Sequence, residues 1–180
     1  MMQRKPIPLT ALYGGIATLA MIVVTLGTYK AGPVSFLKLT VELMYLIPLA
    51  CGAIAALVRR SQQGGYLEFR NALRIIFGIL VLAVALQGVF TWLLVNVIDP
   101  HFGQALRPVW LANTESAYRR FGMPDDEIRK NIDSLKNTNP FSFGSVMLGL
   151  ARVYILGFLI SLILAAITKR KKPMERPTTL

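Results

Sequence analysis

The sequence has little of what disulfides, metal sites and hydrolytic active sites require. It contains one cysteine and one histidine among 180 residues. The lone Cys51 excludes an intrachain disulfide and a cysteine-based metal cluster. His101 stands near Asp99, but one histidine and one carboxylate are too few ligands for a metal ion. The phosphate-loop pattern G-x-x-x-x-G-K-[ST] is missing, as are H-E-x-x-H and G-x-S-x-G. We therefore expect no cofactor and no enzymatic activity.

Charged residues are also scarce inside four long apolar blocks, and this scarcity indicates membrane spans. The chain is 54% hydrophobic, above the ~45–50% apolar content of soluble domains. The blocks cover about 9–29, 39–58, 75–98 and 143–167. Each is long enough to cross the roughly 30 Å hydrocarbon core, and in lipid each must be helical. The first block is too long for the apolar part of a signal peptide. The sequence predicts one all-α membrane domain over 1–180, a four-helix bundle.

The net charge of +11 predicts an orientation rather than nucleic-acid binding. Lysine and arginine cluster before the first span, in the connection 59–74, and in the basic tail 168–180. These segments lie on one side of a four-span protein, and loops rich in Lys and Arg remain in the cytoplasm. We therefore expect a bacterial inner-membrane protein with both termini cytoplasmic. Its basic residues should meet anionic lipids at the cytoplasmic face.

The connection 99–142 is too long for a simple turn and predicts an outer helical hairpin. Its first helix should span about 103–121. Its second should open at Met123–Pro124, with three acidic residues in its first turn. The hairpin either caps the bundle or acts as a lid for a substrate or partner. In the cytoplasmic connection, Tyr66, Phe69 and Leu73 predict a short interfacial helix before the third span.

A few polar residues interrupt the spans, and Arg152 is the most unusual of them. It lies nine residues inside the fourth block, about 13 Å deep at 1.5 Å per residue. An arginine at the bilayer centre costs roughly 2.5–3.5 kcal/mol, so it should not face lipid. Gln87 has a similar depth, and Glu42 is within reach of an extended arginine. The sequence predicts an intramembrane polar cluster of these three residues, with candidate flanking residues Tyr45, Asn96 and Tyr154.

Four segments of the sequence resemble the bacterial domain-of-unknown-function family 4199. They are GGYLEFRNALRIIFG before and into the third span, VNVIDPHF after it, FGMPDDEIRKNID in the outer hairpin, and TKRKK at the end of the last span. The resemblance covers nearly the whole chain. It implies a small four-span bacterial inner-membrane protein and carries over no catalytic residue, since the family has no assigned activity.

Two functions are consistent with these features. The first is a non-enzymatic accessory or assembly subunit that contacts another membrane protein or a second copy of itself. Small residues support it, including Gly52 and Ala56 in the second span, because they leave faces for further helices. The alternative is a small transporter or channel with a polar pocket around Glu42 and Arg152. The polar cluster itself is either a structural lock that fixes helix order or a pocket that binds an anionic group.

Overall fold

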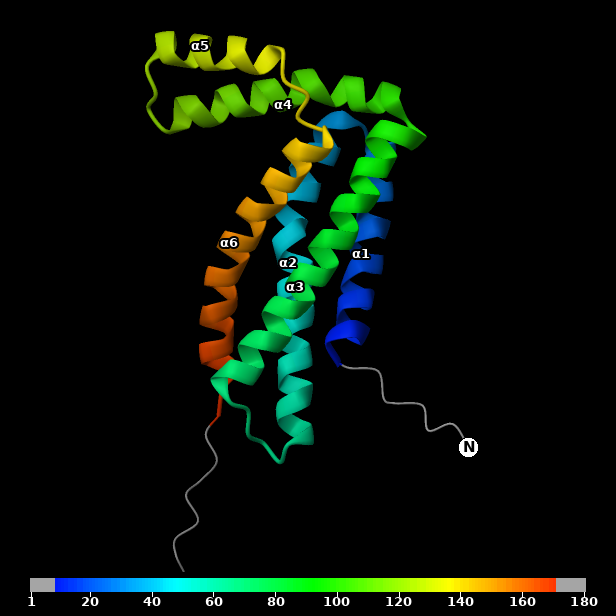
Figure 1. Cartoon of the computed structure of the whole chain (residues 1–180), viewed down its shortest axis with the longest axis vertical. Coiled ribbons are helices and arrows are strands. Elements are labelled where there is room, and N and C mark those ends of the chain that lie inside the picture. The colour runs from blue at the N-terminus through cyan, green and yellow to red at the C-terminus, as the bar shows by residue number, and fades with distance from the viewer. Residues whose placement is uncertain (1–8, 171–180) are drawn as a thin grey trace, which may run out of the picture.

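The computed structural model describes residues 9–170, and helices make up most of this range (Figure 1). Four long helices run side by side as a bundle. They are α1 (Leu9–Ala31), α2 (Pro33–Gln62), α3 (Phe69–Leu93), which continues as the π-helix η1 (Leu94–Ile98), and α6 (Phe143–Thr168). Each is long and apolar enough to cross a membrane. The predicted all-α fold with four membrane-type helices is confirmed.

Two of these helices begin earlier than we predicted from the sequence. Only Gly32 separates α1 from α2, and its φ of +100° lies in a region that favours glycine. Pro33 then starts α2, six residues before the predicted 39, because proline fits the first helical turn. Similarly, α3 begins at Phe69 rather than 75. The short interfacial helix we expected is therefore mostly the first turns of α3 itself.

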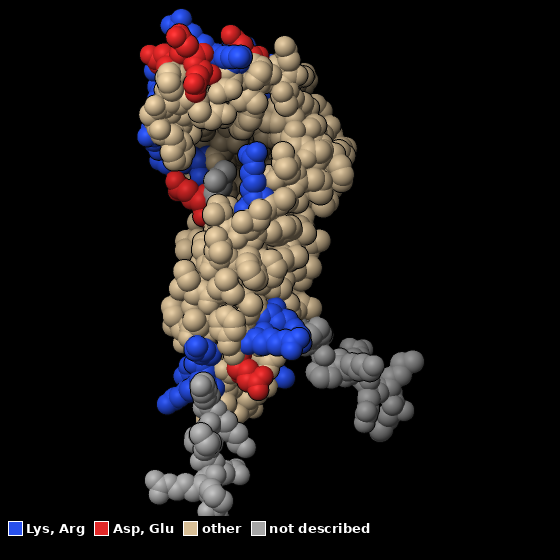
Figure 2. Space-filling model, turned by 60° about the vertical axis from the view of Figure 1, so that its left-hand side comes forward, with Lys and Arg blue, Asp and Glu red and all other residues tan. Residues whose placement is uncertain are grey.

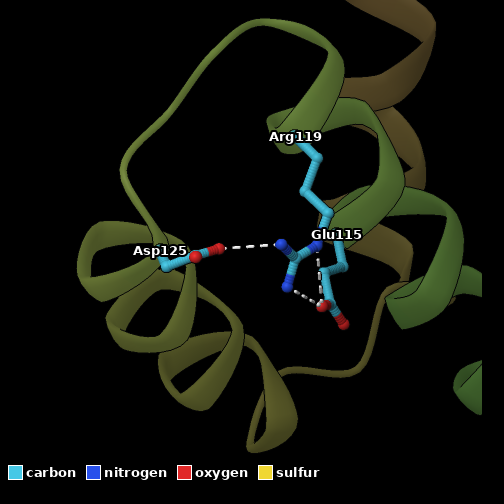
Figure 3. Close-up of polar contacts among 3 residues, drawn as sticks. All are labelled: Glu115, Arg119 and Asp125. Atoms are coloured by element: carbon cyan, nitrogen blue, oxygen red, sulfur yellow. Dashed lines mark hydrogen bonds and ion pairs between the residues drawn. The ribbon is translucent and has the colours of Figure 1, made fainter.

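The predicted hairpin is formed by α4 (Pro100–Arg120) and α5 (Asp125–Lys136), which lie across one end of the bundle (Figure 1). We call this the hairpin end, and the opposite end, where Arg170 lies, the tail end. Arg119 joins the two helices of the hairpin, 3.0 Å from Glu115 and 2.7 Å from Asp125 (Figure 3). All three side chains are exposed, so these ion pairs contribute little to stability.

Asp99 fixes the angle at which the hairpin leaves the bundle. It follows η1 and caps α4, accepting a hydrogen bond from the Phe102 N–H at 3.0 Å. Its other carboxylate oxygen accepts a hydrogen bond from the Tyr29 hydroxyl at 2.7 Å. The Tyr29 bond, followed by the Phe102 bond, lowers the pKa of Asp99. The Phe102 ring packs edge-on against Tyr29 and Phe36. This joint connects α1 and α2 to the start of the hairpin.

Helix α3 is the centre of the bundle because it packs against α1, α2 and α6. Ile76, Ile79 and Leu80 on α3 are fully buried. A Cβ added at Gly52 of α2 would lie 3.0 Å from the Ile76 Cα, so α2 and α3 approach closely there. Ala56 is buried as well. These two small residues thus serve the contact within the bundle, and our expectation that they leave a face for further helices is wrong.

At the tail end, the α2–α3 connection is joined to the end of α6. Leu67 and Arg170 exchange two backbone hydrogen bonds, of 3.0 and 2.8 Å. Leu67 is buried, and the Lys169 ammonium lies 5.8 Å from the centre of the Phe69 ring. The connection and the last described residues of the chain are therefore held together. The rest of the predicted basic tail, from residue 171, lies outside the described residues.

Candidate binding groove between α2 and α6

A hollow of about 530 Å³ lies under the hairpin, between α2 and α6. Figure 2 shows it below the hairpin. The bundle and the hairpin both contribute to its lining: Thr40, Met44, Thr91, Trp110, Thr114, Tyr118, Ser145, Gly149 and Arg152 are among the residues around it. A second hollow of about 460 Å³ lies between the same two helices, and its lining is mainly apolar: Leu46, Leu49, Ala50, Ala53, Ile160 and Leu164, with Glu42 and Tyr45. We call the two hollows together the α2/α6 groove.

Among the residues that the structure describes, Arg152 is the one charged residue that lines the first hollow. The side chain is exposed, and among the described residues it makes no ion pair and no hydrogen bond. Burying such a cation in hydrocarbon without a counter-charge is expensive. A guanidinium has no acceptor and five N–H donors, in a fork that matches a phosphate or a carboxylate. The free donors of Arg152 therefore make the first hollow a candidate site for an anion.

Glu42 lies on the other wall of the groove and does not form the ion pair with Arg152 that we expected. It is exposed and lines the second hollow. Thr40 and Met44, two residues before and after it, line the first hollow with Arg152. The open space between α2 and α6 separates the two charges, and the three ion pairs found within residues 9–170 all lie in the hairpin.

Gln87 belongs to a different contact, so the predicted cluster of three residues is not formed. Its side chain is fully buried, and its amide donates hydrogen bonds to the hydroxyls of Thr25 on α1 and Thr91 on α3. Its carbonyl oxygen is buried without a partner among the described residues. The depth of Gln87 resembles that of Arg152, but the face of α3 that carries it points toward α1. This glutamine therefore contributes to the packing of α1 on α3.

The three predicted flanking residues have three different positions. Tyr45 lines the second hollow of the groove. Asn96 donates hydrogen bonds to the backbone oxygens of Trp92 and Phe141, both at 3.0 Å, and so connects η1 to the segment that precedes α6. The Tyr154 hydroxyl donates to the Val81 carbonyl at 3.3 Å, so it faces α3. Only Tyr45 therefore remains a candidate for contact with a ligand.

Our reading of the sequence missed the contribution of the hairpin to the groove. Trp110, Thr114 and Tyr118 of α4 line the first hollow. They are spaced by four residues, which places them on one face of a helix. This spacing is the signal that could have identified them. The sequence left open whether the hairpin caps the bundle or acts as a lid, and its underside forms the roof of the hollow.

The long apolar helices and the laterally placed groove define a helical membrane protein. Residues 11–170 match the family described as "Protein of unknown function (DUF4199)", and the chain belongs to this family. The match covers most of the chain and confirms the resemblance seen in the sequence. Neither the curated proteins nor the solved structures include a match to this chain.

Proposed function

We propose that this protein is a non-enzymatic membrane protein that binds an amphiphile with a phosphate or carboxylate headgroup in the α2/α6 groove. The observation that carries the proposal is Arg152, an exposed arginine without a partner among the described residues, in a hollow between apolar helices. An anionic headgroup offers the charge-assisted, bidentate hydrogen bonds that this guanidinium lacks. The hydrocarbon chain of the same molecule can then lie along the apolar second hollow.

The size and lining of the groove support this proposal. Both hollows have volumes in the range of small-molecule sites, roughly 300–1,000 Å³. Thr91 and Thr114 add hydroxyl groups around the first hollow, near the level where a headgroup would lie. Trp110 and Tyr118 in its roof are residue types that favour the boundary between lipid and water. A polar upper part and an apolar lower part match the two parts of an amphiphile.

The same geometry favours lipid binding over the accessory subunit that we expected from the sequence. A helix of a partner protein would satisfy Arg152 only if it carried a carboxylate at the matching depth. Membrane phospholipids supply a phosphate at the surface, and an arginine side chain can extend toward it. This proposal keeps the polar pocket around Arg152 and Glu42 from our alternative function, a small transporter or channel. It includes no transport step.

Lipid titration followed by native mass spectrometry tests the proposal. Purified protein in mild detergent is mixed with phosphatidylethanolamine, phosphatidylglycerol, or a diacylglycerol with the same chains. We expect at least one phospholipid to bind about tenfold or more tightly than the diacylglycerol, because charge-assisted hydrogen bonds contribute about 1.5–3 kcal/mol. Arg152→Gln should remove this difference. Arg129→Gln, on an exposed position of α5, is the matched control and should bind as the wild type does.

Two results would contradict lipid binding. One is equal affinity for phospholipid and diacylglycerol in the wild type. The other is a stoichiometric protein that co-purifies and is released by Arg152→Gln while no phospholipid binds, which would restore the accessory-subunit function.

We also propose that the protein lies in a bacterial inner membrane with the tail end in the cytoplasm. Exposed basic residues at the tail end support this orientation: Arg59, Arg70, Arg74, Lys169 and Arg170. Figure 2 shows basic side chains gathered at this end, and a mixture of basic and acidic side chains on the hairpin. The N-terminal Arg4 and Lys5, on which the prediction also rested, lie outside the described residues.

Cysteine labelling checks the orientation. In a Cys51→Ala background, Ser134→Cys on α5 should react with a membrane-impermeant thiol reagent in intact cells without an outer barrier. Ser61→Cys, near the end of α2, should react only after the membrane is permeabilised. Both serines are exposed, so access to reagent should depend on the side of the membrane alone. The reverse pattern would place the hairpin in the cytoplasm.

A further inference from the structure

Glu42 places a negative charge in the same groove as Arg152 and at a similar level. Helices α2 and α6 both start at the hairpin end, at Pro33 and Phe143. Glu42 is nine residues into α2 (42 − 33) and Arg152 is nine residues into α6 (152 − 143). Both are thus about 13 Å along their helices, at 1.5 Å per residue. The groove presents opposite charges on its two walls.

The acidic wall lacks protein partners just as the basic wall does. Glu42 is exposed and forms no ion pair and no hydrogen bond with another described residue. The α2 wall therefore offers a carboxylate, which is an acceptor for a cationic donor.

These charges disfavour a headgroup that is only anionic. A phosphate bound to Arg152 would lie across the groove from Glu42, and the two negative charges would repel each other in a medium of low dielectric constant. A headgroup with both a phosphate and an ammonium would satisfy both walls. Quaternary ammonium groups have no N–H, so they would meet Glu42 by charge alone, without a hydrogen bond.

We infer that the α2/α6 groove selects a zwitterionic aminophospholipid, which binds its phosphate to Arg152 and its primary ammonium to Glu42. This inference rests on the proposed lipid-binding function and specifies the headgroup. The glycerol and acyl chains lie against the apolar residues of the second hollow, between α2 and α6. Selection arises because phosphatidylglycerol lacks an ammonium and the ammonium of phosphatidylcholine has no N–H, whereas this class offers Glu42 both a positive charge and N–H donors.

Competition between headgroups tests the inference. Full-length protein is incubated with equimolar phosphatidylethanolamine and phosphatidylglycerol of identical acyl chains, and bound lipid is counted by native mass spectrometry. We expect the wild type to retain phosphatidylethanolamine about tenfold over phosphatidylglycerol, since one charge-assisted hydrogen bond corresponds to about that ratio. Phosphatidylcholine should bind more weakly than phosphatidylethanolamine, because its ammonium donates no hydrogen bond to Glu42. Glu42→Gln should abolish the preference, and Arg152→Gln should weaken the binding of both lipids.

The matched control is Glu127→Gln, an exposed carboxylate of α5 that should leave the preference unchanged. Glu42 is exposed and forms no ion pair within the described part of the chain, so its substitution should not alter the unfolding temperature, and Glu42→Ala serves as a second variant. Equal binding of both lipids by the wild type, or a preference that survives in Glu42→Gln, would overturn the inference while the proposed function stands. If no phospholipid binds, both are overturned.

Discussion

Gly157→Leu is expected to force α6 away from α3 and to lower the free energy of unfolding by about 1–3 kcal/mol, the usual cost of overpacking. A Cβ built at Gly157 would lie 2.8 Å from a methyl group of Leu80, which is already too close. Leu80 is fully buried, so its side chain has no open space to move into. Ser161 and Ala165, one and two turns further along α6, are also buried. The whole tail-end half of α6 therefore depends on small side chains at this contact.

The control for this prediction is Gly149→Leu, two turns earlier on the same helix. A Cβ at Gly149 meets nothing within 4 Å, and the residue is exposed. Both variants gain the same helix propensity, because leucine replaces glycine in a helix interior. Thermal unfolding in detergent, followed by circular dichroism, compares them. A lower midpoint for Gly149→Leu than for Gly157→Leu would show that α6 packs through its other half.

The pair of glycines also shows what the sequence could and could not predict. Ser145, Gly149, Gly157, Ser161 and Ala165 lie on one ladder of four-residue steps along α6. The ladder correctly predicts a face of close helix contact. Only its last three residues are buried in that contact, however, while Ser145 and Gly149 line the hollow under the hairpin. The spacing shows which residues share a face of α6, but it does not show how far along α6 the contact with the neighbouring helix extends.

The fold was predictable because its signals are local. Four long apolar stretches define four helices, and Pro124 with the acids after it starts α5 as predicted. Helix ends were less predictable, since Gly32 alone is enough to turn α1 into α2. From the sequence alone, a longer connection is expected between these two spans. The predicted start of the second span placed Glu42 near the end of its helix. The earlier start of α2 in the structure makes it the ninth residue after the start, at the level of Arg152.

The candidate site was predictable in part. Counting residues gives the depth of Arg152, Gln87 and Glu42, but it does not give the direction in which each side chain points. That direction depends on how each helix is rotated, which is set by packing across the whole bundle. Gln87 accordingly meets Thr25 on α1, a residue 62 positions earlier in the chain. Arg152 and Glu42 do not form the expected pair, because a groove that no local pattern reveals separates α6 from α2.

Filling this groove should abolish lipid binding without unfolding the protein. Gly149 lines the first hollow and lies three residues before Arg152, on the same side of α6. Because nothing lies within 4 Å of a Cβ at this position, Gly149→Trp can place its indole in the open space instead of in the core. The indole would occupy the room that a headgroup needs beside the guanidinium. We expect at least about a tenfold loss of phospholipid affinity, the loss of one or more charge-assisted hydrogen bonds.

Gly144→Trp is the matched control for this variant. Gly144 is also on α6, is exposed, and has nothing within 4 Å of an added Cβ, but it does not line the groove. Both variants are titrated with phosphatidylethanolamine and followed by native mass spectrometry, and their unfolding midpoints are measured in parallel. The expected result is lost binding in Gly149→Trp alone, with both midpoints close to that of the wild type. If Gly149→Trp stays folded and binds the lipid as the wild type does, the headgroup does not lie between Arg152 and α2, and the ligand site must be sought on another face of the bundle.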